Sequence, residues 1–180
     1  MKKTSYFFSL LLVFFSVISL AQTSSKVKLS TAIEYNDYIV EAQNKIGKTL
    51  LDLNAVVANV ESTHEQAKAS LMVLRNTIDA SINTLENLEQ LTPDYGLRAT
   101  ALDLFRFYKR IMNNQYVQMT DEIYSANPNY ELLDKLLAEV SSEEKTYDDA
   151  FQSAQEQFAS ANNFVLEKNS MQEQIQNKTE

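Results

Sequence analysis

The sequence contains no cysteine and no tryptophan, and only two glycines and two prolines occur among its 180 residues. Without cysteine the chain has no disulfides, thiolate metal sites, covalently attached haem or lipid-modified start. Average usage would give about 12 glycines and about 9 prolines. Because sandwiches, barrels and doubly wound sheets need many turns, which draw on these two residues, their scarcity favours a few long helices.

The N-terminus has the pattern of a secretory signal peptide. Residues 1–3 are Met-Lys-Lys, residues 7–20 are apolar or serine, and Ser19 and Ala21 are small residues at the positions that a signal peptidase recognises. The apolar run is shorter than the roughly 20 residues that a membrane-spanning helix needs. We therefore expect cleavage after residues 1–21, export to the periplasm or the cell exterior, and no integral membrane segment afterwards. Retention of this segment as an anchor is the alternative.

Basic residues are in the minority. The chain has 16 Lys and Arg against 24 Asp and Glu, a formal net charge of −8. Removal of the signal segment takes two lysines and no acid, which changes −8 to −10. Nucleic acids and anionic membranes bind basic surfaces, so this balance argues against both as partners and favours solubility.

Three breaks interrupt the remaining chain. Residues 91–96 (Leu-Thr-Pro-Asp-Tyr-Gly) and residues 127–129 (Asn-Pro-Asn) contain both prolines, which cannot continue a helix interior. The third break contains no proline. Thr63 followed by Gln66 is a capping-box pattern, which indicates the start of a new helix. These breaks divide residues 29–170 into four segments.

Each segment repeats an apolar residue every three or four positions, which is the period of an amphipathic helix. The four stripes are Tyr35, Ile39, Ala42, Ile46, Leu50, Leu53, Val57 and Val60; Ala67, Leu71, Leu74, Ile78, Ile82, Leu85 and Leu88; Leu102, Phe105, Tyr108, Met112, Tyr116, Met119 and Ile123; and Leu133, Leu137, Val140, Tyr147, Phe151, Ala154, Phe158, Ala161 and Val165. They are narrow, like the seam of a supercoiled bundle. Short links make successive long helices antiparallel. We expect an all-α fold: an antiparallel up-down-up-down four-helix bundle over residues 22–170, followed by a frayed or disordered tail over residues 171–180.

Two clusters of opposite charge lie at similar sequence distances from the turn near Pro128. The clusters are Arg106, Lys109 and Arg110 on one side, and Glu143, Glu144, Asp148 and Asp149 on the other. An antiparallel pair of helices would bring them together and fix those helices as neighbours. The alternative is two independent solvated faces, since exposed ion pairs contribute at most about 1 kcal/mol each.

The sequence gives little support for a metal site or a haem site. Di-iron bundles use two Glu-x-x-His motifs, and this chain has one, Glu61 with His64, which straddles a predicted turn and contains the only histidine. His64 with Met112 or Met119 would supply the residue types that ligate a haem. Methionine at helical spacing, however, is usually a packed core residue. We expect no metal or cofactor, and we expect His64 to be a surface residue in the first turn of its helix.

Catalytic motifs are also missing from the sequence. It has no Gly-x-Ser-x-Gly elbow, its lone histidine has no triad partner nearby, and Gly47 and Gly96 are too far apart for a phosphate-binding loop. The acidic pairs lack the alternation and central glycine of a calcium-binding loop. We expect a protein that is not an enzyme and has no catalytic residue.

Tyrosines are the more informative aromatic residues. Four of the nine, Tyr35, Tyr108, Tyr116 and Tyr147, fall on the predicted stripes. A buried tyrosine hydroxyl needs a hydrogen-bond partner. These rings are either ordinary core residues or the lining of a site for a small ligand.

Two stretches carry a resemblance. They are Tyr35-Asn36-Asp37-Tyr38-Ile39-Val40 with Gln43 and Ile46, and Ala99, Ala101-Leu102, Leu104 and Phe107-Tyr108-Lys109. Together they resemble a family of uncharacterised secreted, all-helical bacterial surface proteins. The resemblance implies an envelope or extracellular location and a helical bundle, and it implies no activity and no functional residues.

The sequence thus favours an exported, non-enzymatic helical bundle of the bacterial envelope that acts through protein contacts or as a structural component. The alternative is a small-ligand-binding carrier or sensor with a tyrosine-lined core. The expected partner of the first is a protein, and the oligomeric state stays open.

Overall fold

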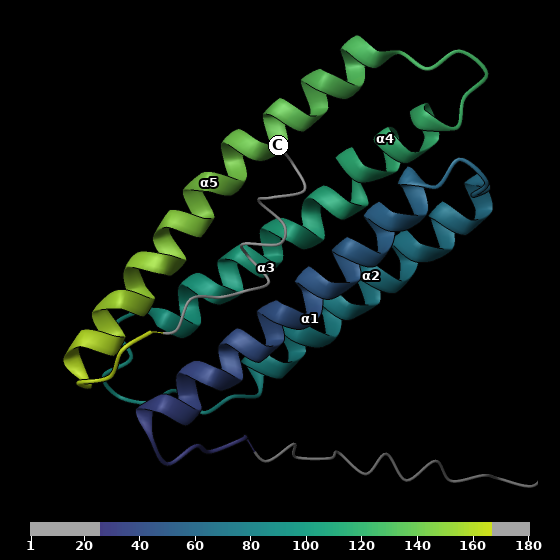
Figure 1. The fold of residues 1–180 in the computed structure, drawn as a ribbon. Helices are drawn as coiled ribbons and strands as arrows, with labels where there is room; N and C mark the ends of the chain where they lie inside the picture. The colour runs from purple at the N-terminus through teal and green to yellow at the C-terminus, as the bar shows by residue number, and fades with distance from the viewer. Residues whose placement is uncertain (1–25, 167–180) are drawn as a thin grey trace, which may run out of the picture.

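The computed structural model describes residues 26–166, and it is all-helical as the sequence predicts (Figure 1). Its elements are α1 (Ala32–Ala58), α2 (His64–Glu86), α3 (Leu97–Asn113), α4 (Gln115–Ile123) and α5 (Tyr130–Ala161). Over the described range the chain forms no strand, although an isolated β-bridge joins Val27 to Leu88. The expected signal peptide over residues 1–21 and the expected tail over residues 171–180 lie outside the described residues.

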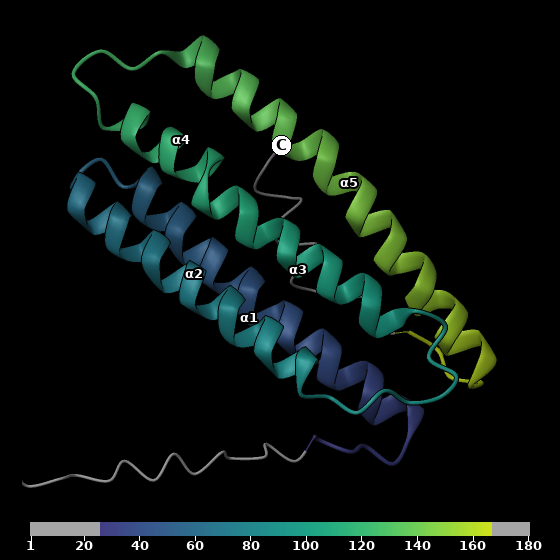
Figure 2. The same ribbon diagram turned by 180° about the vertical axis from the view of Figure 1, so that it is seen from behind.

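The helices lie side by side as long rods, and the turns that connect them alternate between the two ends of the molecule (Figures 1 and 2). α3 and α4 are two parts of one rod, interrupted at Asn114, where φ is −122° and ψ is −82°. α2 packs against both α1 and α3, and α3 packs against α5. Over residues 26–166, five helices therefore make four rods.

Side-chain caps set several helix starts. Thr63 accepts a 3.3 Å hydrogen bond from the backbone of Gln66, and the Gln66 side chain accepts one of 2.8 Å from the backbone of Thr63. This reciprocal box satisfies amides that have no partner within the first turn, and it confirms the predicted break before α2. Thr31 forms the same kind of box at α1, and Asn129, directly after Pro128, caps α5.

The predicted break at residues 91–96 is also confirmed, and its backbone is unusual. Tyr95 has a φ of 52° and Gly96 has a φ of 81°, so two successive residues are left-handed. Glycine adopts this region without steric cost, whereas a side chain there is uncommon. The loop ends where α3 begins at Leu97.

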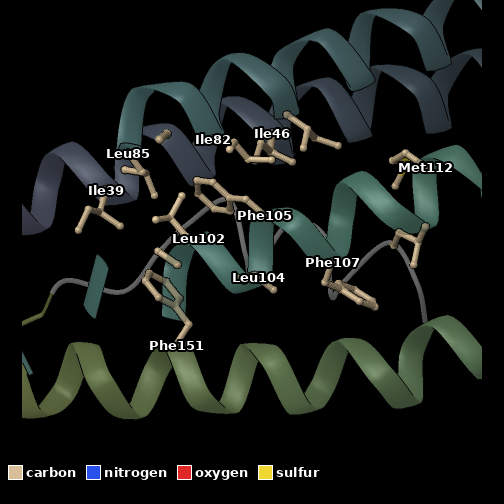
Figure 3. Close-up of a cluster of buried hydrophobic side chains, with 14 of the residues drawn as sticks. Ile39, Ile46, Ile82, Leu85, Leu102, Leu104, Phe105, Phe107, Met112 and Phe151 are labelled. Atoms are coloured by element: carbon tan, nitrogen blue, oxygen red, sulfur yellow. The ribbon is translucent and has the colours of Figure 1, made fainter. Parts of the chain in front are cut away.

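The core is a continuous set of apolar side chains from all four rods. Every residue of the stripe predicted for the second segment is buried. Figure 3 shows Phe105 of α3 pointing toward Ile46 of α1 and Ile82 of α2, while Phe107 lies on the side of α3 that faces α5. All four of these residues belong to one hydrophobic cluster.

The expectation of narrow stripes is wrong for α3. This helix buries a broad face because it lies between two neighbours, α2 and α5. Its buried residues are Leu97, Ala101, Leu102, Leu104, Phe105, Phe107, Ile111 and Met112. Three or four apolar positions per two turns are typical of a globular helix, whereas five of the seven residues 101–107 are buried in α3.

Several residues of the predicted stripes are exposed instead of buried. Val60 is 99% exposed and Val165 is 90% exposed, because each lies beyond the end of its helix. Leu137 is 49% exposed, and Leu136 takes its place in the core with 6% exposure. The helical period does not distinguish the two leucines, because both lie three or four positions from Leu133 and from Val140. Two further residues, Ala161 and Ile123, are also exposed at helix ends.

None of the described helices combines the length and the apolar character that crossing a bilayer requires.

Candidate functional site

Tyr35, the first of the four candidate tyrosines, is completely buried on α1. Its hydroxyl donates a 3.2 Å hydrogen bond to Oδ2 of Asp94, which is only 4% exposed. The other carboxylate oxygen of Asp94 accepts bonds from the Gln90 side chain at 2.9 Å and from the Gly96 amide at 3.1 Å. Burial, and then the Asp94 charge, raise the pKa of Tyr35 far above its usual range. The phenol therefore acts as a neutral donor that holds the loop before α3 against α1.

The other three candidate tyrosines lie between the α3–α4 rod and α5. The Tyr108 hydroxyl forms a hydrogen bond with the carboxylate of Glu144, and burial raises the pKa of Tyr108 well above its usual range. Burial, and then the Glu144 charge, raise the pKa of Tyr116 to about 12. The Tyr147 ring stacks on Phe107, with ring centroids 4.9 Å apart and an interplanar angle of 23°.

Glu144 is the acidic member of this group, and its environment favours the protonated form. Burial raises the pKa of its carboxyl above the ordinary value, and the nearby Asp148 charge acts in the same direction. The hydrogen bond from Tyr108 opposes this effect without reversing it. A partly buried carboxyl next to two phenols can exchange a proton at a higher pH than an exposed glutamate.

The structure therefore divides the predicted tyrosine set in two. Tyr35 packs on Phe158, with ring centroids 5.6 Å apart, and uses Asp94, whereas Tyr108, Tyr116 and Tyr147 gather around other partners. Nothing in the sequence indicated that Asp94 would be a buried hydrogen-bond acceptor. An aspartate directly after Pro93 indicates only a turn.

Two of the surface hollows are lined by described residues, and none of the four tyrosines lines either one. The larger, about 550 Å³, lies between α1 and α2. The smaller, about 420 Å³, lies between Tyr95 and the last turns of α5. The larger hollow is lined by Ala42, Lys45, Lys48, Thr49, Val73, Asn76, Thr77, Ala80, Ser81 and Thr84.

One border of the larger hollow is an uncharged surface, which we call the outer strip of α2. Its members are Ala69, Met72, Val73, Asn76, Thr77, Ala80 and Thr84. Met72 is 61% exposed and Val73 is 54% exposed. Sixteen helical residues span roughly 24 Å at 1.5 Å per residue, so the strip is a sizeable apolar and neutral surface in a chain of which 22% is charged. Sequence reasoning considered only the buried stripe of this helix, although a helical projection of α2 would have shown the strip.

His64 lies in the first turn of α2 and is partly exposed, as predicted. Its Nε2 is 2.9 Å from Oδ1 of Asp121 on α4, and its ring stacks on Tyr124 with centroids 5.4 Å apart. Lys68 reaches the same Asp121 oxygen at 3.3 Å. Glu61 lies in the turn before α2, so the Glu-x-x-His motif does not share one helix face.

The methionines considered as haem ligands lie apart from this histidine's contacts. Met112 is 2% exposed in the main hydrophobic cluster, and Met119 is 6% exposed in a smaller one. Among the described residues, His, Asp and Glu side chains form no group of three that could hold a metal ion.

The predicted pairing of charge clusters is correct in part. Arg110 forms an ion pair with Glu143, which joins α3 to α5. The other two basic residues turn toward α2: Arg106 pairs with Glu86 at 3.0 Å, and Lys109 pairs with an α2 aspartate at 2.7 Å. The basic cluster thus divides between the two neighbours of α3.

Comparison with known proteins gives no relative: no family model, curated protein or solved structure matches the chain. The geometry described above is therefore the basis for assigning a function. Its most informative parts are the outer strip of α2, the Tyr108–Glu144 group and the contacts of Asp121.

Proposed function

We propose that the chain is an exported, non-enzymatic helical-bundle protein of the bacterial envelope that acts through protein contacts or as a structural component. The observation that carries this proposal is the outer strip of α2, with Met72 and Val73 more than half exposed. A contiguous patch of exposed apolar side chains is typical of a protein-binding surface, and Met72 and Val73 are adjacent members of this strip. The signal-peptide pattern over residues 1–21 and the resemblance to secreted surface proteins support export.

The arrangement that we propose for the rods is an antiparallel up-down-up-down four-helix bundle. The turns that alternate between the two ends support it (Figures 1 and 2). So does the hydrogen bond of 2.8 Å from Gln155 on α5 to Asn36 on α1, which links the first and last rods. A pair of cysteines introduced at these two positions would be joined by a short bifunctional thiol reagent in such a bundle, whereas a pair at Asn36 and the more distant Leu137 would not.

Export is tested by locating the chain in the producing bacterium. We expect the protein in the periplasmic or extracellular fraction, with a mature N-terminus at Gln22 when it is sequenced. A full-length N-terminus in the membrane fraction would indicate a retained anchor. A cytoplasmic protein with an intact N-terminus would contradict the proposal.

The protein contact is tested with a photoreactive residue in place of Val73, compared with the same residue in place of Leu137. Both positions are about half exposed, at 54% and 49%, but Leu137 lies on α5, away from the strip. We expect one reproducible protein adduct from position 73, absent from position 137 and abolished by Met72→Lys. Adducts of a second copy would identify the strip as a self-association surface. Equal, diffuse labelling at both positions would contradict a specific contact.

The second candidate is a small-ligand carrier or sensor, and the observation that favours it is the grouping of Tyr108, Tyr116 and Glu144. Thermal-shift measurements with apolar and aromatic metabolites test it. A ligand that binds there should raise the unfolding temperature of the natural chain more than that of the Tyr116→Phe variant. Equal shifts for both chains would place the ligand elsewhere.

A further inference from the structure

One side of α1 continues the line along which this helix meets α5. It begins after Asn36, the residue that holds the hydrogen bond from α5. Residues at steps of three and four positions lie next to one another on a helix surface. We call this surface the side face of α1, and its members are Val40, Asn44, Gly47 and Leu51. All four are uncharged, and none of them lines the hollow between α1 and α2.

The side face is shielded from water without belonging to the described core. Gly47 is buried, and the other three members are partly buried. Among the described residues, neither hydrophobic cluster includes Val40 or Leu51. Oδ1 of Asn44 is buried and has no hydrogen-bond partner in the described part of the chain. Because a buried acceptor normally has a donor, this face calls for a further segment that supplies one.

The two long helices beside the side face do not provide that segment. α1 packs chiefly against α2, whereas α5 packs chiefly against α3. The hydrogen bond between Asn36 and Gln155 joins α1 to α5 near the start of α1. Among the hydrogen bonds between described residues, none joins a later residue of α1 to α5.

The chain turns back at the end of α5, close to the start of the side face. Asn163 has a φ of 56°, and the amide of Phe164 donates a 3.1 Å bond to the carbonyl of Ala159. A left-handed residue followed by such a bond is a common way for a chain to leave a helix. The Phe164 ring packs on Phe158 with centroids 6.0 Å apart, and Phe158 packs on Tyr35 of α1. The last described residues therefore lie at the end of the bundle where α1 begins (Figure 1).

The residues that follow are numerous enough to reach along the whole face. Residues 167–180 add 14 positions beyond the described range. The distance along α1 from Asn36 to Leu51 is about 22 Å at 1.5 Å per residue. Fourteen residues span roughly 21 Å as a helix and up to about 46 Å when extended. Either conformation covers the side face.

Residues 169–177 (NSMQEQIQN) also match the side face in chemistry. Glu173 is the only charged residue among these nine, as suits a face without charge. Met171 and Ile175 are four positions apart and supply apolar side chains. The glutamines at positions 172, 174 and 176 carry amide donors of the kind that Oδ1 of Asn44 lacks.

We propose that residues 167–180 fold back along the bundle and cover the side face of α1, with Met171 and Ile175 against its apolar side chains. The same chain then supplies the donor for Asn44. This placement replaces the frayed tail that the sequence alone predicts for residues 171–180. It leaves the outer strip of α2 free, because no member of the side face lines the hollow beside that strip.

Single cysteines test this placement in a chain that has no other thiol. Leu51→Cys reports on the side face, Lys48→Cys on an exposed side of α1, and Leu74→Cys on the main core. The Lys48 side chain is 72% exposed and Leu74 is 0% exposed. Each cysteine is introduced into the full chain and into a chain that also carries Met171→Lys and Ile175→Lys. The measurement is the rate of thiol labelling in dilute solution.

We expect the two lysines to speed labelling at position 51 roughly tenfold, because a docked segment must open locally before the thiol beneath it reacts. Labelling at positions 48 and 74 should stay unchanged. An unchanged rate at position 51 would overturn the proposal. Equal acceleration at positions 51 and 74 would also overturn it, since it would show a general loss of stability. Protection of position 51 that falls on dilution would show that a second copy covers the face.

Backbone hydrogen exchange gives the same comparison without a cysteine, should one of the cysteine variants fail to fold. We expect the amides of residues 169–177 to exchange more slowly in the natural chain than in the chain with Met171→Lys and Ile175→Lys. Equal exchange in the two chains, at the rates of an unstructured peptide, would overturn the proposal.

Discussion

The Gln155 side chain on α5 donates a 2.8 Å hydrogen bond to the side-chain oxygen of Asn36 on α1, across 119 positions of sequence. Asn36 is only 7% exposed, so its amide is largely removed from water. A buried polar group of this kind stabilises the fold only while its partner is present. The pair therefore makes the contact between the first and last rods specific.

Loss of this partner should weaken the fold. We expect Gln155→Ala to lower the free energy of unfolding by roughly 1–3 kcal/mol, because it leaves the Asn36 oxygen unsatisfied. Urea unfolding followed by circular dichroism measures the change. Gln157→Ala, at an exposed position of the same helix, is the matched control and should leave the midpoint nearly unchanged. Equal effects of the two substitutions would show that α1 and α5 do not depend on this bond.

Alkaline solution should unfold the protein through its buried tyrosines. The pKa values of Tyr35, Tyr108 and Tyr116 are raised, that of Tyr116 to about 12. An unfolded tyrosine ionises near its ordinary value of about 10. The folded state keeps these protons longer, so their contribution to stability is complete below about pH 10 and is lost as the pH rises above it.

The corresponding measurement is a tyrosinate absorbance titration alongside circular dichroism. We expect the exposed tyrosines to ionise first and the buried ones to ionise together with loss of helix. In the Tyr116→Phe variant, one fewer tyrosine should ionise in the second step. A single step near the ordinary pKa, with the helices intact, would contradict the burial of these hydroxyls.

Glu144 should oppose stability at neutral pH. Burial is the main cause that raises the pKa of its carboxyl in the folded state. The protonated carboxyl therefore favours the folded state fully below the unfolded pKa of about 4.3, and this stabilisation is lost as the pH rises through the folded pKa. We expect Glu144→Gln to raise the unfolding temperature near neutral pH and to have little effect in acid, because the glutamine carbonyl can still accept the Tyr108 bond.

Glu143→Gln is the matched control, because Glu143 is adjacent to Glu144 in sequence but pairs with Arg110 on the surface. It should be neutral or slightly destabilising, by less than about 1 kcal/mol. Calorimetry of both variants across the acid and neutral range separates the two effects. If Glu144→Gln destabilises the protein at neutral pH, the carboxylate is stabilised by its surroundings and our assignment is wrong.

Two adjacent leucines on α5 should differ sharply. Leu136 is 6% exposed and packs in a small cluster with Met119 and Leu133, whereas Leu137 is 49% exposed. We expect Leu136→Ala to lower the free energy of unfolding by roughly 2–5 kcal/mol and Leu137→Ala to change it by about 0.5 kcal/mol or less. Denaturant titration of both variants is sufficient. The reverse order would place α5 one residue out of register.

What the sequence could predict was local. The all-helical class, the Thr63 cap and the whole buried stripe of α2 follow from residue spacing and from the preferences of single residues. The choice between Leu136 and Leu137 did not follow, because both fit the same period. The breadth of the buried face of α3 could not be predicted from the sequence either, because it depends on how many neighbouring helices pack against α3.

The candidate site was less predictable than the fold. His64 was placed correctly on the surface, but its partner Asp121 lies 57 positions away on another helix. The buried carboxylate of Asp94 is equally a product of tertiary structure, because a turn aspartate is normally solvated. Such pairs depend on the packing of rods, which no local pattern in the chain encodes.

The bridge between Val27 and Leu88 has a mechanical consequence. Val27 donates to the carbonyl of Asn87 and accepts from the amide of Glu89, each at 2.8 Å. Val27 precedes α1 in the chain, and both of its partners directly follow α2. Tension applied to the polypeptide at Lys26 would load this two-bond clasp, and with it the end of α2, before it could unwind the first turn of α1.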